Sequence, residues 1–181
     1  MPFIPSLPVD ASPLAIYKAY PEIYGPWSQM SEAIMNGSSP FSEAERELLF
    51  SYAAGAAGCD FVCIAHSEVA YARGVPRGTV EALLADPATP QIDERLRPVA
   101  VLIRLLMTQP HAVTQAHVDA VVAAGWDAAG LNDVIAIAGR AAFMQCIVAG
   151  YGLVPMQREV AAQHAQRRIA LGYVNVVNGR P

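Results

Sequence analysis

The chain has almost no alternation of apolar and polar residues with a period of two, the pattern that indicates a half-buried β-strand. It also has no Asn-Gly or Asp-Gly hairpin turn between β-branched runs. Helical patterns are frequent instead. The longest, from Leu131 to Tyr151, is nearly all apolar and typical of a helix that is buried on most sides. The sequence therefore predicts an all-α fold, a compact helical bundle.

Helix start and stop residues divide the chain into elements. Ser42 and Glu45 form a capping box, S-x-x-E, which opens a helix, and Gly58 interrupts the path before the next one. The predicted helices span residues 27–35, 42–57, 59–73, 79–85, 93–107, 117–124, 131–151 and 156–171. We expect one domain, residues 1–181, in which the proline-rich residues 1–26 form an extended N-terminal arm. The tail after Gly172 lies against the body or pairs with a partner, and the sequence leaves both open.

Composition bounds the partners of the chain. Apolar residues make up 54% and charged residues only 15% of the 181 positions, which is high for a soluble monomer and predicts a homo-oligomer. The net charge of -4 argues against nucleic acid and anionic membrane surfaces as partners.

The sequence also predicts a cytoplasmic protein. The N-terminus has no cationic start before an apolar core, as a secretory leader would have. Arg140 and Gln145 interrupt the longest candidate for a membrane span, residues 134–154. Three cysteines, two of them close together, do not make a secreted disulfide framework.

Chemistry-bearing residues gather in the stretch GCDFVCIAH, which contains Cys59, Cys63 and His66. In a helix each residue advances about 100°, so these three side chains are expected to share one face. The break at Gly58 lets the preceding helix fold back, so that Glu47 faces them. A carboxylate and an imidazole beside a thiol favour the reactive thiolate. A zinc site is the alternative use of these ligands, but C-x3-C-x2-H is not a standard structural zinc spacing. We expect no metal and no cofactor.

The pattern E-x11-C followed by a histidine seven residues later, in ERELLFSYAAGAAGCDFVCIAH, resembles the carboxymuconolactone decarboxylase and alkylhydroperoxidase D superfamily, particularly its peroxidase-related members. The segment from LRPVAVLIRLLMTQ to AGYGLVP is similar to the second half of that superfamily, so the likeness covers roughly residues 42–155. It implies an all-helical fold in oligomers, often trimers or hexamers.

The resemblance also implies roles for residues. In the peroxidase branch the motif is E-x11-C-x2-C-x3-H, in which the second cysteine attacks the peroxide and the first resolves the sulfenic acid. Glu47, Cys59 and His66 match this motif, but Val62 stands in the position of the attacking cysteine and Cys63 comes one residue late. The implied activity is a thiol peroxidase that acts on a hydroperoxide and is recycled by an external thiol or dithiol. Cys63 is its nucleophile, Cys59 its resolving thiol, Glu47 its base and His66 its proton relay.

Helix geometry leaves the thiol mechanism open. Side chains at i and i+4 have Cβ atoms about 5–6 Å apart, whereas a disulfide needs about 3.5–4.5 Å. A disulfide between Cys59 and Cys63 would be strained in regular helix but could close if Cys59 lies in a non-helical entry. In a one-cysteine mechanism, Cys63 forms a sulfenic acid that an external thiol reduces.

Two other classes of function remain. One is a cofactor-free decarboxylase or lactone-handling enzyme of the same superfamily, in which acid and base residues carry the work. The other is a non-catalytic, redox-sensing oligomeric protein. Among the remaining residues, Cys146 is expected in the core, and Arg140 in a buried or interface ion pair rather than on a substrate carboxylate. Trp27, with Tyr24, is a candidate for lining a pocket beneath the N-terminal arm.

Overall fold

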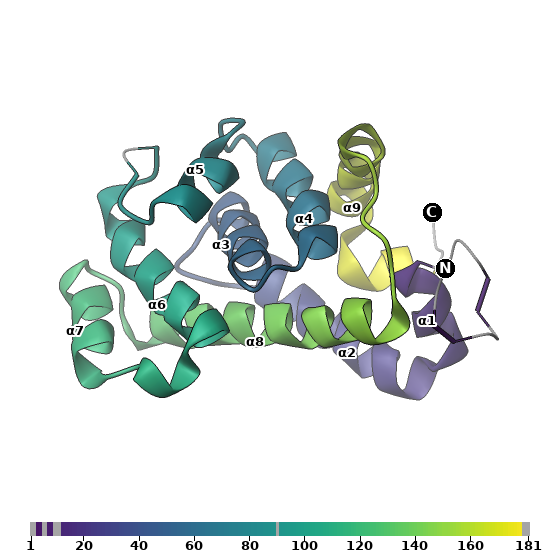
Figure 1. Ribbon diagram of the computed structural model, residues 1–181, viewed down its shortest axis with the longest axis horizontal. Helices are drawn as coiled ribbons and strands as arrows, with labels where there is room; N and C mark the ends of the chain where they lie inside the picture. The colour runs from purple at the N-terminus through teal and green to yellow at the C-terminus, as the bar shows by residue number, and fades with distance from the viewer. Residues whose placement is uncertain (1–2, 5–6, 9–11, 90, 179–181) are drawn as a thin grey trace.

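The computed structural model describes residues 3–4, 7–8, 12–89 and 91–178, and the side chains of 176–178 are left aside. Within these residues the chain is helical, with no strand, so the predicted all-α fold is confirmed (Figure 1). The helices are α1 (Pro13–Ala19), α2 (Pro21–Asn36), α3 (Glu43–Ala56), α4 (Asp60–Ala72), α5 (Thr79–Ala85), α6 (Arg97–Thr108), α7 (Gln115–Ala123), α8 (Ala128–Tyr151) and α9 (Arg158–Asn178), with short 3-10 turns η1 (Glu94–Leu96) and η2 (Pro110–Ala112).

Helices α3 and α4 pack against each other and form the centre of the bundle (Figure 1). The predicted capping box starts α3: the Ser42 side chain accepts a hydrogen bond from the Glu45 backbone N–H, and the Glu45 side chain accepts one from the Ser42 N–H. Gly58 adopts a φ of 74°, a left-handed conformation that glycine reaches without a steric penalty. The chain reverses there, and α4 starts after Cys59. Residues on α3 therefore face residues on α4, as the sequence predicts.

Helix α8 runs beneath α3 and α6 along the length of the molecule (Figure 1). By length and composition alone it is apolar enough to cross a membrane, a test that core helices of folded proteins also pass. Its buried side packs against α3, while Ile135 and Phe143 on the opposite side are exposed. The oligomer that the apolar composition suggests stays a prediction.

The N-terminal segment differs from the extended arm expected for residues 1–26. From Pro13 onward it is helical, in α1 and α2. Both helices carry a proline at their first position, Pro13 and Pro21, where the fixed φ favours a helix and the missing N–H has no helical partner to lose. The prolines therefore mark helix starts there. Residues 1–2, 5–6 and 9–11 of the expected arm lie outside the described residues.

Helix α9 packs against α4 and α2, and its first stretch ends at Gly172, as the sequence predicts, before a second helical stretch continues to Asn178. Gly172 has a φ of 68° and a ψ of -166°, so the helix is kinked there. The backbone N–H of Tyr173, just after the kink, donates a hydrogen bond of 2.5 Å to the Glu32 carboxylate on α2. The start of the tail, which the sequence left undecided, thus lies against the body.

Candidate active site

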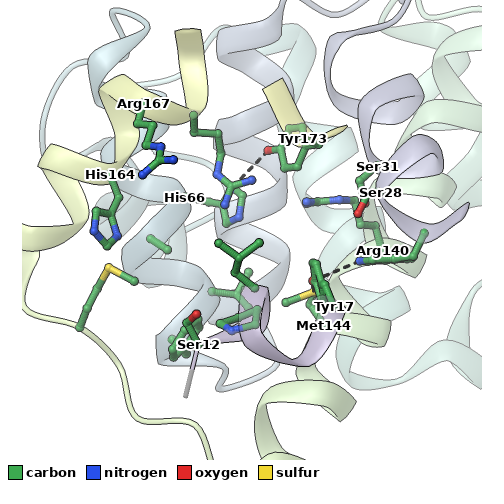
Figure 2. A pocket seen from close by; sticks show the side chains of 18 residues that line it. Ser12, Tyr17, Ser28, Ser31, His66, Arg140, Met144, His164, Arg167 and Tyr173 are labelled. Atoms are coloured by element: carbon green, nitrogen blue, oxygen red, sulfur yellow. Dashed lines mark hydrogen bonds between the residues drawn. The ribbon is translucent and has the colours of Figure 1, made fainter. Parts of the chain in front are cut away.

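A cavity of about 230 Å³ lies among α1, α2, α4, α8 and α9 (Figure 2). Its walls combine aromatic and aliphatic side chains with serines, histidines and arginines. The lining residues are Ser12, Pro13, Leu14, Tyr17, Trp27, Ser28, Ser31, Phe61, Val62, Ala65, His66, Arg140, Met144, Met156, His164, Arg167, Arg168 and Tyr173. Trp27 lines it as expected from the sequence, whereas Tyr24 does not.

His66 lines this cavity and forms a buried pair with Glu47, which lies behind it and does not line the cavity. Glu47 comes from the middle of α3 and is fully buried, and His66 comes from α4 and is 7% exposed. The carboxylate Oε2 lies 2.8 Å from Nδ1 of His66. Phe50, one turn after Glu47 on α3, places its ring at right angles to the imidazole with 4.5 Å between the centroids. The antiparallel contact of α3 and α4 thus brings these two predicted site residues together.

Tyr173, after the kink of α9, completes the arrangement. Its hydroxyl donates a 2.6 Å hydrogen bond to Oε1 of Glu47, so both carboxylate oxygens have a partner. Its ring is parallel to the imidazole, with 6.2 Å between the centroids. The carboxylate is therefore held from two sides, and its orientation fixes that of the His66 ring.

Burial and pairing set the protonation states. Burial alone would raise the pKa of Glu47, but His66, the Tyr173 hydrogen bond and the nearby Arg140 together lower it. Burial lowers the pKa of His66 to about 4 against the raising effect of Glu47. At neutral pH the pair is a carboxylate and a neutral imidazole. A carboxylate only accepts hydrogen bonds, so Nδ1 carries the proton and Nε2 keeps its lone pair.

Arg140, on α8, is also buried in this wall. It is 4% exposed, and its guanidinium lies 3.9 Å from the ring centroid of Phe50 and 4.6 Å from that of Tyr173. The sequence suggests an ion pair for Arg140, and no carboxylate forms one with it among the described residues. Its Nε and Nη1 are buried there without a hydrogen-bond partner.

The two cysteines of the motif do not line the cavity. Val62, Ala65 and His66 are the α4 residues after Phe61 that face it. Because neighbouring residues in a helix are about 100° apart, Cys63 points well away from Val62, while His66, four residues on, shares the direction of Val62. Cys63 and His66 both meet α3, as the predicted common face requires, but of Cys59, Cys63 and His66 only His66 lines the cavity.

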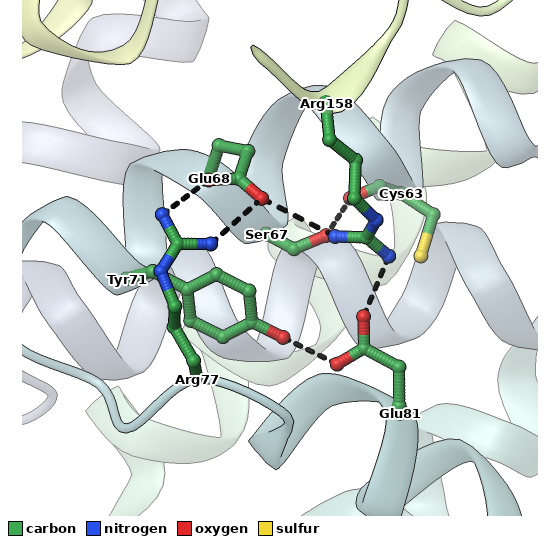
Figure 3. A network of polar contacts seen from close by, with 7 residues as sticks. All are labelled: Cys63, Ser67, Glu68, Tyr71, Arg77, Glu81 and Arg158. Carbon is green, nitrogen blue, oxygen red and sulfur yellow. Dashed lines mark hydrogen bonds and ion pairs between the residues drawn. The ribbon is translucent and has the colours of Figure 1, made fainter. Parts of the chain in front are cut away.

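Cys63 instead faces α3 and α5. Its sulfur lies against Gly55 of α3, where an added Cβ would come within 3.0 Å of it. Figure 3 shows it beside Arg158 and Glu81, which belong to a network of ion pairs on the other side of α4. Burial raises the pKa of the Cys63 thiol to about 11, so the thiolate is disfavoured at neutral pH.

Cys59 lies in a third environment. It is buried just before α4 and lines a shallow hollow with Gln145 and Val148 of α8. Burial raises the pKa of its thiol as well. All three cysteines are free thiols, and Cys146 is exposed rather than in the core, because it lies on the outer side of α8. In the part of the chain that the structure describes, no group of three His, Cys, Asp or Glu side chains is placed to hold a metal ion.

Comparisons with known proteins identify the fold. No protein-family model matches the chain, and no curated protein matches its sequence. Among solved structures, a peroxidase-related protein from Silicibacter sp. TM1040 superposes with a TM-score of 0.72 at 17% identity, over 79% of this chain and 75% of that one. A peroxidase-related protein from Ralstonia eutropha JMP134, described as an alkylhydroperoxidase AhpD core, gives 0.70 at 16% identity over 79% and 75%.

A third similar structure is the debrominase Bmp8, a cysteine-to-alanine variant in complex with 2,3,4-tribromopyrrole. Its TM-score is 0.71 at 16% identity, over 86% of this chain and 81% of that one. The chain therefore has the alkylhydroperoxidase AhpD fold, which confirms the resemblance at the level of architecture.

Proposed function

We propose that this chain of the AhpD fold is a cofactor-free enzyme that moves protons on a small organic molecule. His66 is the general base and acid, and Glu47 orients it. The observation that carries the proposal is the buried Glu47–His66 pair at the wall of a cavity in which Val62, not a cysteine, stands beside the imidazole. Of the functions that the sequence left open, this belongs to the decarboxylase or lactone-handling class, and the step described next is an isomerisation of a lactone, in which a proton moves and no carbon dioxide leaves.

The proposed mechanism uses groups already in place. Nε2 of His66 removes a proton from the bound molecule, and the resulting imidazolium is stabilised by the Glu47 carboxylate at Nδ1. The same nitrogen returns the proton to another atom of the molecule, so no electrons are exchanged with an external partner. Tyr173 keeps the carboxylate from rotating. The complex of a debrominase of this fold with tribromopyrrole supports a small, flat molecule as the kind of substrate that fits.

A thiol peroxidase is the second candidate. Two free thiols, Cys59 and Cys63, lie at the start of one helix, and two structures of the same fold are named as peroxidase-related. In this activity Cys63 would attack a hydroperoxide and become a sulfenic acid. Cys59 would then form a disulfide with it, and an external thiol or dithiol would reduce that disulfide. It requires Cys63 to leave its packing against Gly55 and to ionise despite a raised pKa.

One assay separates the two. Wild type, His66→Gln, the Cys59→Ser/Cys63→Ser double variant and a control, His111→Gln in exposed η2, are tested on a carboxylated lactone and on cumene hydroperoxide with dithiothreitol. We expect lactone turnover to fall about 100-fold or more in His66→Gln and to stay near wild type in the other two. Peroxide turnover that disappears in the double cysteine variant, with the lactone untouched, would establish the second candidate instead.

A further inference from the structure

The cavity is lined by positively charged side chains, although the protein as a whole is acidic. The whole protein has 16 acidic and 12 basic residues, yet Arg140, Arg167 and Arg168 line the cavity and no aspartate or glutamate does so among the described residues. His164 and Arg167 lie together on α9 (Figure 2), and Arg168, the next residue, lines the cavity as well. An acidic protein that gathers cations around one cavity offers that cavity to an anion.

The deepest of these cations lacks the partners that its burial requires. Arg140 lies between the rings of Phe50 and Tyr173, and neither its Nε nor its Nη1 has a hydrogen-bond partner among the described residues. Ser31 of α2, which lines the same cavity, has a buried hydroxyl that also lacks a partner among the described residues. Buried polar groups normally have hydrogen-bond partners, and leaving one unpaired is costly. Two such groups at one cavity wall point to a missing acceptor.

Glu47 is not that acceptor. Its oxygens are taken by His66 and Tyr173, and no hydrogen bond joins it to Arg140. The acceptor must therefore come with a ligand. A carboxylate suits both groups, because a guanidinium N–H and a hydroxyl each donate a charge-assisted hydrogen bond to a carboxylate oxygen.

We propose that Arg140 and Ser31 form a carboxylate-binding subsite, which anchors a small, flat carboxylic acid in the cavity. The size follows from the volume of about 230 Å³, below the roughly 300–1,000 Å³ of pockets for drug-sized ligands. The flat shape follows from the rings of Tyr17, Trp27 and Phe61 in the walls. The inference deepens the proposed function and rests on it for one point, that the anchored molecule is the one that meets His66.

Calorimetric titration with benzoate and with benzamide tests the subsite without requiring turnover. The two probes share a flat ring and differ in charge. We expect wild type to bind benzoate at least about tenfold more tightly than benzamide, because only benzoate offers a charged acceptor for hydrogen bonds from Arg140 and Ser31. Arg140→Met should bind both equally weakly. The control Arg95→Met, which removes an arginine stacked on Trp126 outside the cavity, should keep the preference.

Trp27 reports where the probe binds. In a Trp126→Phe background it is the only tryptophan, and its ring lies 6.0 Å from the guanidinium of Arg140. Benzoate should change its fluorescence with the affinity found by calorimetry. Equal affinities for the two probes in wild type, no benzoate binding, or a preference that survives in Arg140→Met would each overturn the subsite. The wild-type comparison decides even if Arg140→Met does not fold.

The subsite and the proposed function can fail separately. Selective benzoate binding together with lactone turnover that is unaffected in His66→Gln would keep the subsite and reject His66 as the base. Loss of turnover in His66→Gln without selective benzoate binding would keep the base and reject the subsite.

Discussion

Two buried carboxylates on neighbouring helices have different partners. Glu47 on α3 is 0% exposed and bonds to the imidazole of His66, a cavity-lining group that can exchange a proton, and to the phenol of Tyr173. Glu68 on α4 is 2% exposed and bonds to two arginines, Arg77 and Arg158, that never lose their charge at physiological pH (Figure 3). The hydrogen-bond partners of these two carboxylates, rather than their burial, therefore indicate their different roles.

The Glu68 network is suited to holding helices together. Arg158, at the start of α9, reaches Glu68 on α4 at 3.3 Å and Glu81 on α5 at 2.6 Å. The side chains of both arginines remain partly exposed, so the network closes over a surface rather than a cavity. It fixes one end of α9, while Tyr173 and Glu32 fix the other. Cys63 lies on this side of α4, which is why we assign it to the packing of the fold.

The largest effect that separates the two carboxylates is on catalysis. Glu47→Gln keeps the shape of the side chain but removes the charge that stabilises the His66 imidazolium, so we expect turnover to fall about 100-fold or more. The matched variant Glu68→Gln should retain turnover within a few-fold. Steady-state kinetics on the lactone measures both, and equal losses in the two variants would contradict the division of roles.

A thiol placed on the cavity side of α4 should react faster than the native one. In Val62→Cys the new thiol lines the cavity beside His66, whereas Cys63 stays packed against Gly55. We expect alkylation by iodoacetamide at position 62 to be at least tenfold faster than at Cys63, because the neighbouring imidazole can accept the thiol proton and raise the thiolate fraction there. Peptide mapping by mass spectrometry quantifies both sites in one sample. Faster labelling of Cys63 would show that our account of the two faces of α4 is wrong.

Replacing Glu68 should lower the free energy of unfolding of the protein. Glu68→Gln leaves the arginine network without its central charge, and we expect the free energy of unfolding to drop by about 1–3 kcal/mol. Urea denaturation followed by circular dichroism measures the change. Arg77→Gln removes only the more exposed partner and serves as the milder control. A stability equal to that of wild type would mean that the network does not hold α9.

An effect of similar size is expected on the pH dependence of stability. The pKa of His66 is about 4 in the folded protein and near 6.5 in an unfolded chain, so between these values the unfolded state binds a proton that the folded state does not. Stability from His66 is therefore present above pH 6.5 and lost as the pH falls toward 4. Wild type should lose about 1–3 kcal/mol over this window, and His66→Gln should lose less. Parallel slopes in the two proteins would contradict a buried neutral imidazole.

Local patterns were sufficient to predict much of this arrangement. The capping box at Ser42, the break at Gly58 and helical periodicity together predict the α3–α4 contact and the meeting of Glu47 with His66. The all-α fold follows from the same periodicity. These features depend on residues close in sequence, which propensity and spacing describe well.

Other features depend on long-range packing, which no local pattern contains. Tyr173 reaches Glu47 only because α9 crosses α4 and kinks at Gly172. Arg140 stands out in the sequence because it is charged within an apolar stretch. The sequence does not show that aromatic rings, rather than a carboxylate, surround its guanidinium. The direction of Cys63 was missed because the sequence shows which residues share a helix face but not which neighbour that face meets.

The state of His66 tests the central claim most directly, and nitrogen-15 NMR of the imidazole measures it without a substrate. Our account predicts a neutral ring at pH 7 with the proton on Nδ1, a pKa near 4, and no change of either in Cys63→Ser. A protonated ring at pH 7, or a neutral ring with its proton on Nε2, would leave no base facing the cavity and would contradict the account.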